Sequence, residues 1–247
     1  MIDTQEHNEY LYSIISGTKV LFLVNHFNTL TQRVETELKD YDVWVTVREV
    51  KGKKDIVKAV AEVEHDIILC PFLTRRVPRS VWDSEDGKPC LILHPGIPGD
   101  RGPSSIDWAL KMQAPRWGLT VLQADEEMDA GDIWASKTFP ITSDTMTKTE
   151  LYVADVTDAA VEAALLALVR FRLGLPPVPL DYGNPGVKGT LMPIMQDKDR
   201  MIDWNSSAFD VGETVRMADT QPGGIGELHV SKYFQISQIR SPHFRFP

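Results

Sequence analysis

A histidine at the end of a short apolar run is the residue of this sequence best placed for chemistry. His94 follows the run from Cys90 to Leu93, and residues 94–102 read HPGIPGDRG. Because proline and glycine restrict the backbone around it, this loop presents the imidazole at the end of a strand. Histidine gains and loses a proton near neutral pH, so the position favours general acid–base chemistry. The alternative is a loop histidine that only makes structural hydrogen bonds.

Carboxylates gather in a second segment, directly after another apolar run. Residues 125–132 read DEEMDAGD and follow the run from Leu119 to Ala124. Gly131 favours a tight turn in this segment. A carboxylate held beside a histidine can orient the ring and stabilise its charged form. A solvated acidic turn is the alternative for such a run of charges.

The other histidines and the cysteines do not predict a metal site. The histidines considered as metal ligands lack the clustered spacing that a metal site needs: His7, His65, His229 and His243. We therefore predict no bound metal. Cys70 and Cys90 each lie inside an apolar run, which is typical of buried free thiols in a reducing compartment.

Alternating strand and helix patterns predict the framework that positions these residues. Short apolar or β-branched runs typical of strands occur at 19–25, 43–47, 66–70, 90–93, 119–124 and 133–139. Apolar residues at helical spacing predict helices over 29–40, 55–63 and 148–173. This alternation indicates an α/β fold with a Rossmann-like open sheet, mostly parallel at least in its first half. Ligands bind beyond the carboxyl ends of such strands, which points to the residues after Asn25, Cys70, Leu93 and Ala124.

The predicted domain organisation follows from changes in composition. Residues 1–18 form a polar leader, 19–175 an α/β domain, 176–193 a Pro/Gly-rich linker, and 194–247 a weakly patterned C-terminal module whose end alternates apolar and polar residues. The chain has 26 Lys and Arg against 35 Asp and Glu, a net charge of −9. An acidic chain repels phosphate backbones and anionic membranes, so we expect neither nucleic acid nor a membrane as partner. The absence of a secretion signal or long apolar stretch predicts a cytoplasmic protein.

The first strand-to-helix turn argues against dinucleotide binding. Residues 25–28 read NHFN and contain no Gly-x-Gly, the pattern with which nucleotide-binding domains hold a pyrophosphate. Asn28 is a candidate cap for the helix that follows, and Thr29 is another.

Three short blocks resemble the folate-dependent formyltransferases. His94-Pro95-Gly96 matches the strand end that carries their histidine, Arg101-Gly102 matches their next loop, and Asp129-Ala130-Gly131 matches a turn whose aspartate pairs with the histidine. The segment DRMIDW at 199–204 is similar to the start of the C-terminal module of methionyl-tRNA formyltransferases. Within this superfamily, segments 27–33 and 94–108 most resemble the N-terminal half of the HoxX or HypX hydrogenase maturation proteins.

The resemblance implies formyl transfer from 10-formyltetrahydrofolate to an acceptor, with coenzyme A as the acceptor proposed for the HoxX/HypX group. It implies that His94 moves a proton during the transfer and that Asp129 orients the imidazole of His94. The implied folate-binding residues border the predicted sheet edge: Leu69, Cys70, Phe72, Leu73, Gly96, Arg101, Asp125 and Met128. From the residues alone, Phe72 and Leu73 are equally compatible with simple packing. Asp100 and Arg101 could hold an acceptor phosphate or pair with each other, and we expect Asp100 to stabilise its loop.

Two departures from the family pattern define the alternatives. The family asparagine two residues before the histidine is Ile92 here, so the amide that would donate to the developing oxyanion is missing. A backbone N–H near Gly96 is one candidate to replace the amide as the donor to the oxyanion. The sequence also stops where the hydratase-like half of HoxX/HypX begins, so we expect the formyltransferase-C-like module at 194–247 to be incomplete. Three explanations are open: a separate enoyl-CoA hydratase-like protein supplies the second step, the sequence is a truncated copy of a two-half protein, or the domain serves another purpose. The alternatives are a non-catalytic folate-binding or scaffold relic, and a methionyl-tRNA formyltransferase, which the acidic charge disfavours.

Overall fold

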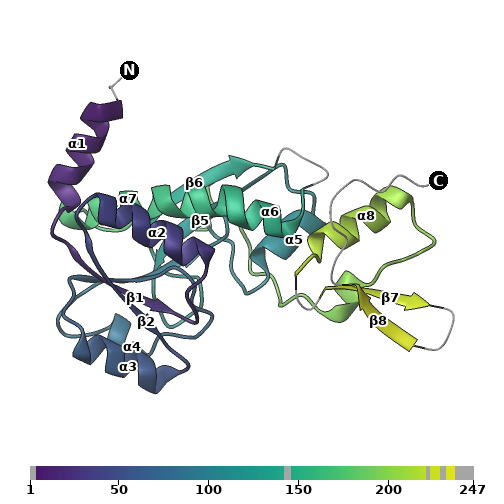
Figure 1. Ribbon diagram of the computed structural model, residues 1–247, viewed down its shortest axis with the longest axis horizontal. Helices are drawn as coiled ribbons and strands as arrows, with labels where there is room; N and C mark the ends of the chain where they lie inside the picture. Colours follow the sequence, from purple (N-terminus) through teal and green to yellow (C-terminus); the bar gives the residue numbers. More distant parts are fainter. Residues whose placement is uncertain (1–3, 142–145, 221–222, 229–231, 237–247) are drawn as a thin grey trace.

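An open six-stranded sheet carries the main part of the molecule (Figure 1). The computed structural model describes residues 4–141, 146–220, 223–228 and 232–236. The strands of this sheet are β1 (Lys19–Val24), β2 (Trp44–Glu49), β3 (Ile67–Cys70), β4 (Cys90–His94), β5 (Arg116–Gln123) and β6 (Ile133–Pro140). The helices that belong to it are α1 (Thr4–Ile15), α2 (Thr29–Asp40), α3 (Lys53–Glu62), α4 (Arg79–Trp82), α5 (Ser105–Lys111), α6 (Lys148–Leu151), the π-helix η1 (Tyr152–Val156) and α7 (Thr157–Arg172).

The strand order is β2-β1-β3-β4-β5-β6. The neighbours β2, β1, β3 and β4 run parallel, whereas β5 is antiparallel to β4 and β6 is antiparallel to β5. The predicted open α/β sheet with a parallel first half is therefore confirmed. From β1 the chain moves to β2 on one side and then to β3 on the other, so the loops after β1 and β3 diverge at the carboxyl edge. Such a reversal of strand order leaves a crevice where ligands bind.

Helices cover both faces of the sheet, which explains why its strands read as continuous apolar runs. Alternate residues of β1 enter different cores: Val20 and Phe22 pack with α1, α2 and α7, whereas Leu21 and Leu23 pack with α3 and α4. Figure 1 shows this layered arrangement, with α2 and α7 above β1 and β2 and with α3 and α4 below them. None of the helices within the described ranges is long and apolar enough to cross a membrane.

Two helical segments differ from the sequence pattern. The predicted polar leader contains α1, because its Leu11 and Ile15 are buried in the core beside α7 and a helix with so few apolar residues shows little periodicity. The predicted helix 148–173 is present but changes its winding at the π-helix η1, where the Thr157 hydroxyl donates to the carbonyl of Tyr152 at 2.8 Å. Single π-helical turns inside α-helices are frequent at functional sites.

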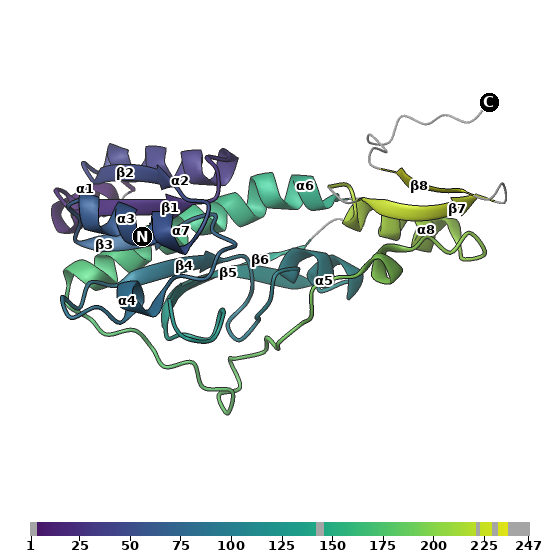
Figure 2. The same ribbon diagram turned by 90° about the horizontal axis from the view of Figure 1, so that it is seen from below.

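The Pro/Gly-rich segment 176–193, here named the strap, is irregular but bonded to the sheet domain. Its Val178 exchanges backbone hydrogen bonds with Ile133. Further along, Arg101 donates to the carbonyl of Thr190 and its own carbonyl accepts from Met192. In Figure 2 the strap runs from the end of α7 towards the C-terminal elements on the side of the sheet away from α2. The strap therefore supports the loop that follows β4.

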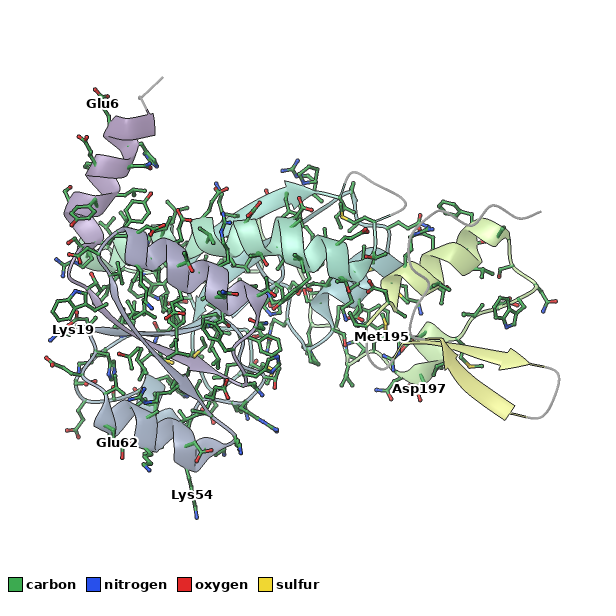
Figure 3. All side chains as sticks on the ribbon, in the orientation of Figure 1. Glu6, Lys19, Lys54, Glu62, Met195 and Asp197 are labelled. Carbon is green, nitrogen blue, oxygen red and sulfur yellow. The ribbon has the colours of Figure 1, made fainter. Side chains whose placement is uncertain are left out.

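The weakly patterned sequence after the strap forms a small unit. It contains a 3-10 helix η2 (Asp197–Arg200), α8 (Ala208–Met217) and the antiparallel pair β7 (Gly224–Leu228) and β8 (Lys232–Ile236). Met195, which Figure 3 labels together with Asp197, is buried at the junction, where its N–H donates to the Ser104 hydroxyl at 3.0 Å. The last part of the predicted alternation, residues 237–247, lies outside the described residues.

The turn between β5 and β6 demands glycine at position 131. Gln123 donates its N–H to the carbonyl of Asp132 at 2.8 Å, and a Cβ on residue 131 would lie 1.9 Å from the carbonyl oxygen of Gln123. Gly131→Ala is expected to lower the free energy of unfolding by about 1–3 kcal/mol, because the two backbone segments must separate. Urea unfolding followed by circular dichroism measures this change.

Gly52→Ala is the matched control for that experiment, since a Cβ at Gly52 meets nothing within 4 Å. Gly52 is the N-cap of α3, so its replacement should cost at most about 1 kcal/mol. Equal losses in the two variants would contradict the close approach at Gly131.

Candidate active site

The end of β4 places His94 at the carboxyl edge of the sheet. β4 lies between β3 and β5, and His94 pairs with Thr120 of β5. Ile92 and His94 are two residues apart on one strand, so their side chains share a face of the sheet. The imidazole is 95% buried, with 5% of its surface exposed. The strand therefore presents His94 inside the crevice and with little access to bulk water.

The loop after β4 turns back and brings Asp100 against the histidine. The Asp100 Oδ2 atom lies 2.8 Å from His94 Nε2, and the carboxylate is almost fully buried. Gly96 makes this possible, because a Cβ there would lie 2.3 Å from Asp100 Oδ2 and 2.5 Å from His94 Nε2. Glycine at this position is thus a requirement of the histidine–carboxylate contact.

Asp129 approaches the other side of the ring. Its Oδ2 atom lies 3.5 Å from His94 Nδ1, which is longer than a normal hydrogen bond, and accepts the N–H of Gly102 at 3.2 Å. Asp129 has a positive φ of 56°, a conformation that aspartate tolerates better than most residues. The bond to Gly102 holds the carboxylate beside the histidine.

The path by which Asp129 reaches His94 differs from the expectation. Because β5 is antiparallel to β4, Ala124 lies beside Cys90 at the start of β4 and not at the carboxyl edge. The expectation that the residues after Ala124 follow a strand end at that edge was wrong. Segment 125–131 instead folds back along β4, and this return brings Asp129 to the ring.

An imidazole between two carboxylates can hold and pass on a proton. Asp100 and Asp129 fix the orientation of the ring, and each ring nitrogen of His94 faces a carboxylate oxygen. Since all three groups are buried, their interactions are screened by water much less than at a surface. The arrangement is suited to general acid–base chemistry on a bound substrate.

A cavity of about 300 Å³ opens beside His94 and Asp129. Its walls are mainly apolar and include Leu30, Phe72, Leu73, Val77, Ile92, Pro103 and Leu119. Charged and polar side chains add to the lining, among them Arg75, Arg76, Asp125 and Glu127. Tyr152 of η1 also lines the cavity. An apolar cavity with a few polar groups is the usual form of a small-molecule site.

The structure brings together most of the residues singled out from the sequence. The cavity is lined by His94, Asp129, Phe72, Leu73, Asp125 and Met128. Leu69 and Cys70 do not line it, because both are fully buried inside the doubly covered sheet. Gly96 lies in the loop behind His94 and also stays outside the lining.

Arg101 binds protein groups and not Asp100. Its guanidinium lies 2.8 Å from Glu127 Oε2, and its Nε donates to the carbonyl of Met128 at 3.0 Å. These bonds tie the loop after β4 to the segment that carries Asp129. Asp100 faces His94 instead, and sequence reasoning missed that contact, although the glycines of HPGIPGDRG signalled a loop able to turn back on itself.

The cysteines and the helix cap agree with their predictions. Cys70 and Cys90 are buried free thiols. A hydrogen bond with Cys90 and burial raise the pKa of the Cys70 thiol, so that it stays protonated. Asn28, and not Thr29, is the N-cap of α2. Within the described ranges, no group of three or more His, Cys, Asp or Glu side chains is arranged to hold a metal ion.

Comparisons with known proteins agree with this geometry. The Formyl transferase family model matches residues 19–168. The chain is 36% identical over 228 residues to the hydrogenase maturation factor HoxX of Bradyrhizobium diazoefficiens, covering 91% of this chain and 38% of HoxX. It also matches the crystal structure of HypX from Aquifex aeolicus in complex with tetrahydrofolic acid, with a TM-score of 0.78 and 36% identity over 86% of this chain and 36% of HypX.

A methionyl-tRNA formyltransferase from Clostridium thermocellum shares the fold, with a TM-score of 0.65 and 12% identity over 86% of this chain and 88% of that one. The chain spans less than two fifths of the HoxX and HypX chains that it matches. These likenesses confirm the resemblance seen in the sequence. Since the family model covers more than half of its length, the chain belongs to the formyl transferase family.

Proposed function

We propose that this chain transfers a formyl group from 10-formyltetrahydrofolate to an acceptor. The observation that carries the proposal is the buried His94, held between Asp100 and Asp129 at the wall of an apolar cavity. The similarity to HypX, which was crystallised with tetrahydrofolic acid, supports folate as the donor. The similarity to the hydrogenase maturation factor HoxX supports a role in hydrogenase maturation.

The cavity suits the flat pterin ring of a folate. Phe72, Leu73 and Ile92 supply apolar surface, and the neighbouring Asp125 offers a carboxylate to the ring's amino group. Arg75 is exposed and lines the same cavity, so it can pair with the carboxylates of the folate's glutamyl tail. Folate is a substrate in this proposal, and its role is to supply the formyl group.

His94 moves one proton during the transfer. The acceptor's nucleophilic atom forms a bond to the formyl carbon and loses its proton to His94 Nδ1. Nδ1 can take it because Nε2 is bonded to Asp100 at 2.8 Å, whereas Nδ1 lies 3.5 Å from Asp129, beyond normal hydrogen-bond distance. The electron pair of the C=O bond moves onto oxygen and returns as the bond from carbon to the folate N10 breaks. N10 then takes the proton from His94, so one bond forms, one breaks and tetrahydrofolate leaves. Asp129 and Asp100 orient the imidazole throughout.

Coenzyme A is the acceptor that we propose, which would make the product formyl-CoA. A thiol carries the single proton that the step above requires. An enoyl-CoA hydratase-like unit, on the same chain or on another, would then act on the formyl thioester. Methionyl-tRNA is the competing acceptor, and the charge of −9 argues against binding tRNA.

The first test is a single-turnover assay of the full chain with 10-formyltetrahydrofolate, with and without coenzyme A. Release of tetrahydrofolate should depend on coenzyme A, and His94→Ala should lower its rate by about 10²- to 10⁴-fold, the usual value of general acid–base catalysis. Absorbance of tetrahydrofolate and mass spectrometry of formyl-CoA measure the two products. His7→Ala, which removes an exposed histidine of α1, is the control and should match the wild type.

The other outcomes separate the alternatives. Release without an acceptor would identify a hydrolase, and release only with methionyl-tRNA would identify that acceptor. Calorimetric binding of folate with no release under any condition would exclude transfer and leave the folate-binding relic, a reading that the isoleucine at position 92 favours.

The second test separates the two carboxylates. Asp100→Asn and Asp129→Asn should each lower the single-turnover rate by at least about 10-fold, because each removes a charge that positions His94. The single-turnover rate of the double variant should be only slightly lower than that of the slower single variant. The two losses do not add, because both carboxylates act through the same imidazole. Asp83→Asn, at the exposed C-cap of α4, serves as the surface control. Wild-type rate in Asp100→Asn, or losses that multiply in the double variant, would contradict joint action on His94.

A further inference from the structure

Position 92, two residues before His94, lacks the hydrogen-bond donor that formyl transfer requires. When an acceptor adds to the formyl carbon, the formyl oxygen becomes negatively charged and needs a hydrogen-bond donor. Ile92 lines the cavity and offers none. The N–H of Gly96 donates to the carbonyl of His94 at 2.8 Å, so it is already occupied. The hydroxyl of Ser105 lines the cavity too, but donates to the carbonyl of Pro95 at 2.7 Å.

Tyr152 stands at the same cavity with an unused proton. Its Oη atom accepts a hydrogen bond from Asn28 Nδ2 at 3.0 Å. The side-chain amide of Asn28 cannot be flipped, because its Oδ1 already accepts from the N–H and the hydroxyl of Thr31 at 2.9 and 2.8 Å. Throughout the described part of the chain, the hydrogen bond from Asn28 is the only one recorded for the Tyr152 hydroxyl. The phenolic proton is therefore available to a ligand in the cavity.

We propose that the Tyr152 hydroxyl donates a hydrogen bond to the formyl oxygen and stabilises the negative charge that this oxygen carries during transfer. The inference rests on the proposed formyl transfer and names the group that replaces the missing amide. The phenol keeps its proton: the C=O electron pair moves onto oxygen as the acceptor bonds to carbon, and returns as the bond to N10 breaks. The step therefore adds no proton transfer to the one made by His94.

Two further features fit this role. Burial raises the pKa of the Tyr152 phenol above its ordinary value, so it remains a donor at neutral and mildly alkaline pH. Tyr152 is also the first residue of the π-helix η1, where the helix changes its winding beside the cavity. Asn28 comes from the N-terminus of α2, so the pair joins two elements far apart in the sequence.

Two variants test the proposal in the single-turnover assay. Tyr152→Phe keeps the ring and removes only the hydroxyl, and should lower the rate by about 10²- to 10³-fold with little change in folate affinity. Asn28→Asp keeps a good cap for α2 but can only accept, so it should capture the phenolic proton and cause a loss of the same order. Tyr12→Phe, an exposed tyrosine of α1, is the control.

A purely structural role predicts a different pattern. If Tyr152 only packs, Tyr152→Phe and Asn28→Asp should change thermal stability or folate affinity and leave the rate of the bound complex within about threefold of the wild type. Since one missing donor costs about 10²-fold or more, that outcome overturns the proposal while the proposed function stands. Gln123, whose side-chain Oε1 accepts from Trp134 Nε1 at 3.0 Å and whose Nε2 carries N–H donors, would then be the next donor on the wall to replace.

If the wild-type chain binds folate without turnover, NMR spectroscopy tests the hydrogen bond from Tyr152 directly. The ¹³C resonance of a labelled formyl group is measured in complexes with the wild type and Tyr152→Phe. A hydrogen bond to the oxygen shifts the carbonyl carbon downfield, so the wild-type resonance should lie downfield of the variant's. Identical resonances in such a chain overturn the proposal. If the wild type binds no folate at all, the proposed function fails, and this inference fails with it.

Discussion

The contact between His94 and Asp100 is the constraint on which the rest of the site depends. Burying an imidazole and a carboxylate costs solvation free energy that only close and well-oriented partners offset. The 2.8 Å approach requires the bare backbone at Gly96 and a loop that doubles back within six residues. That loop is held from outside by the strap through Arg101 and from inside by Asp129 through Gly102. The Pro/Gly-rich strap is thus part of the support of the histidine.

The sheet topology decides which segments can meet this pair. The parallel order of β1, β3 and β4 puts their carboxyl ends at one edge, so His94 at the end of β4 lies at the same edge as Asn28 and Phe72, which follow β1 and β3. The antiparallel β5 would carry its following residues away from that edge. Segment 125–131 returns along β4 instead, and the bonds from Arg101 to Glu127 and Met128 hold it. A sheet with one reversed strand thereby surrounds the cavity on several sides.

Local pattern predicted the framework and the central histidine, because both are recorded in neighbouring residues. The apolar runs of β1, β3 and β4 reflect burial on two faces, and His94 stands out where such a run ends. The same burial explains why Leu69 and Cys70 pack inside the sheet and do not reach the cavity. Asp100 could not be assigned to His94, since the fold of its loop depends on the strap, 75 or more residues away in sequence. Tyr152 reads as an ordinary helical residue until η1 and the cap of α2 are placed side by side.

Ile92 makes the cavity wall more apolar, in addition to removing a hydrogen-bond donor. An apolar side chain in place of an amide extends the apolar wall formed with Phe72 and Leu73 and leaves fewer groups to hold water near His94. In such surroundings each remaining electrostatic contact is stronger than it would be in water. A single phenolic donor, held by Asn28, can then stabilise a negatively charged oxygen that would require an amide donor in a more hydrated site. In the proposed transfer, Ile92 and Tyr152 are therefore two parts of one arrangement, in which the negative charge on the substrate is stabilised from helix η1 and not from strand β4.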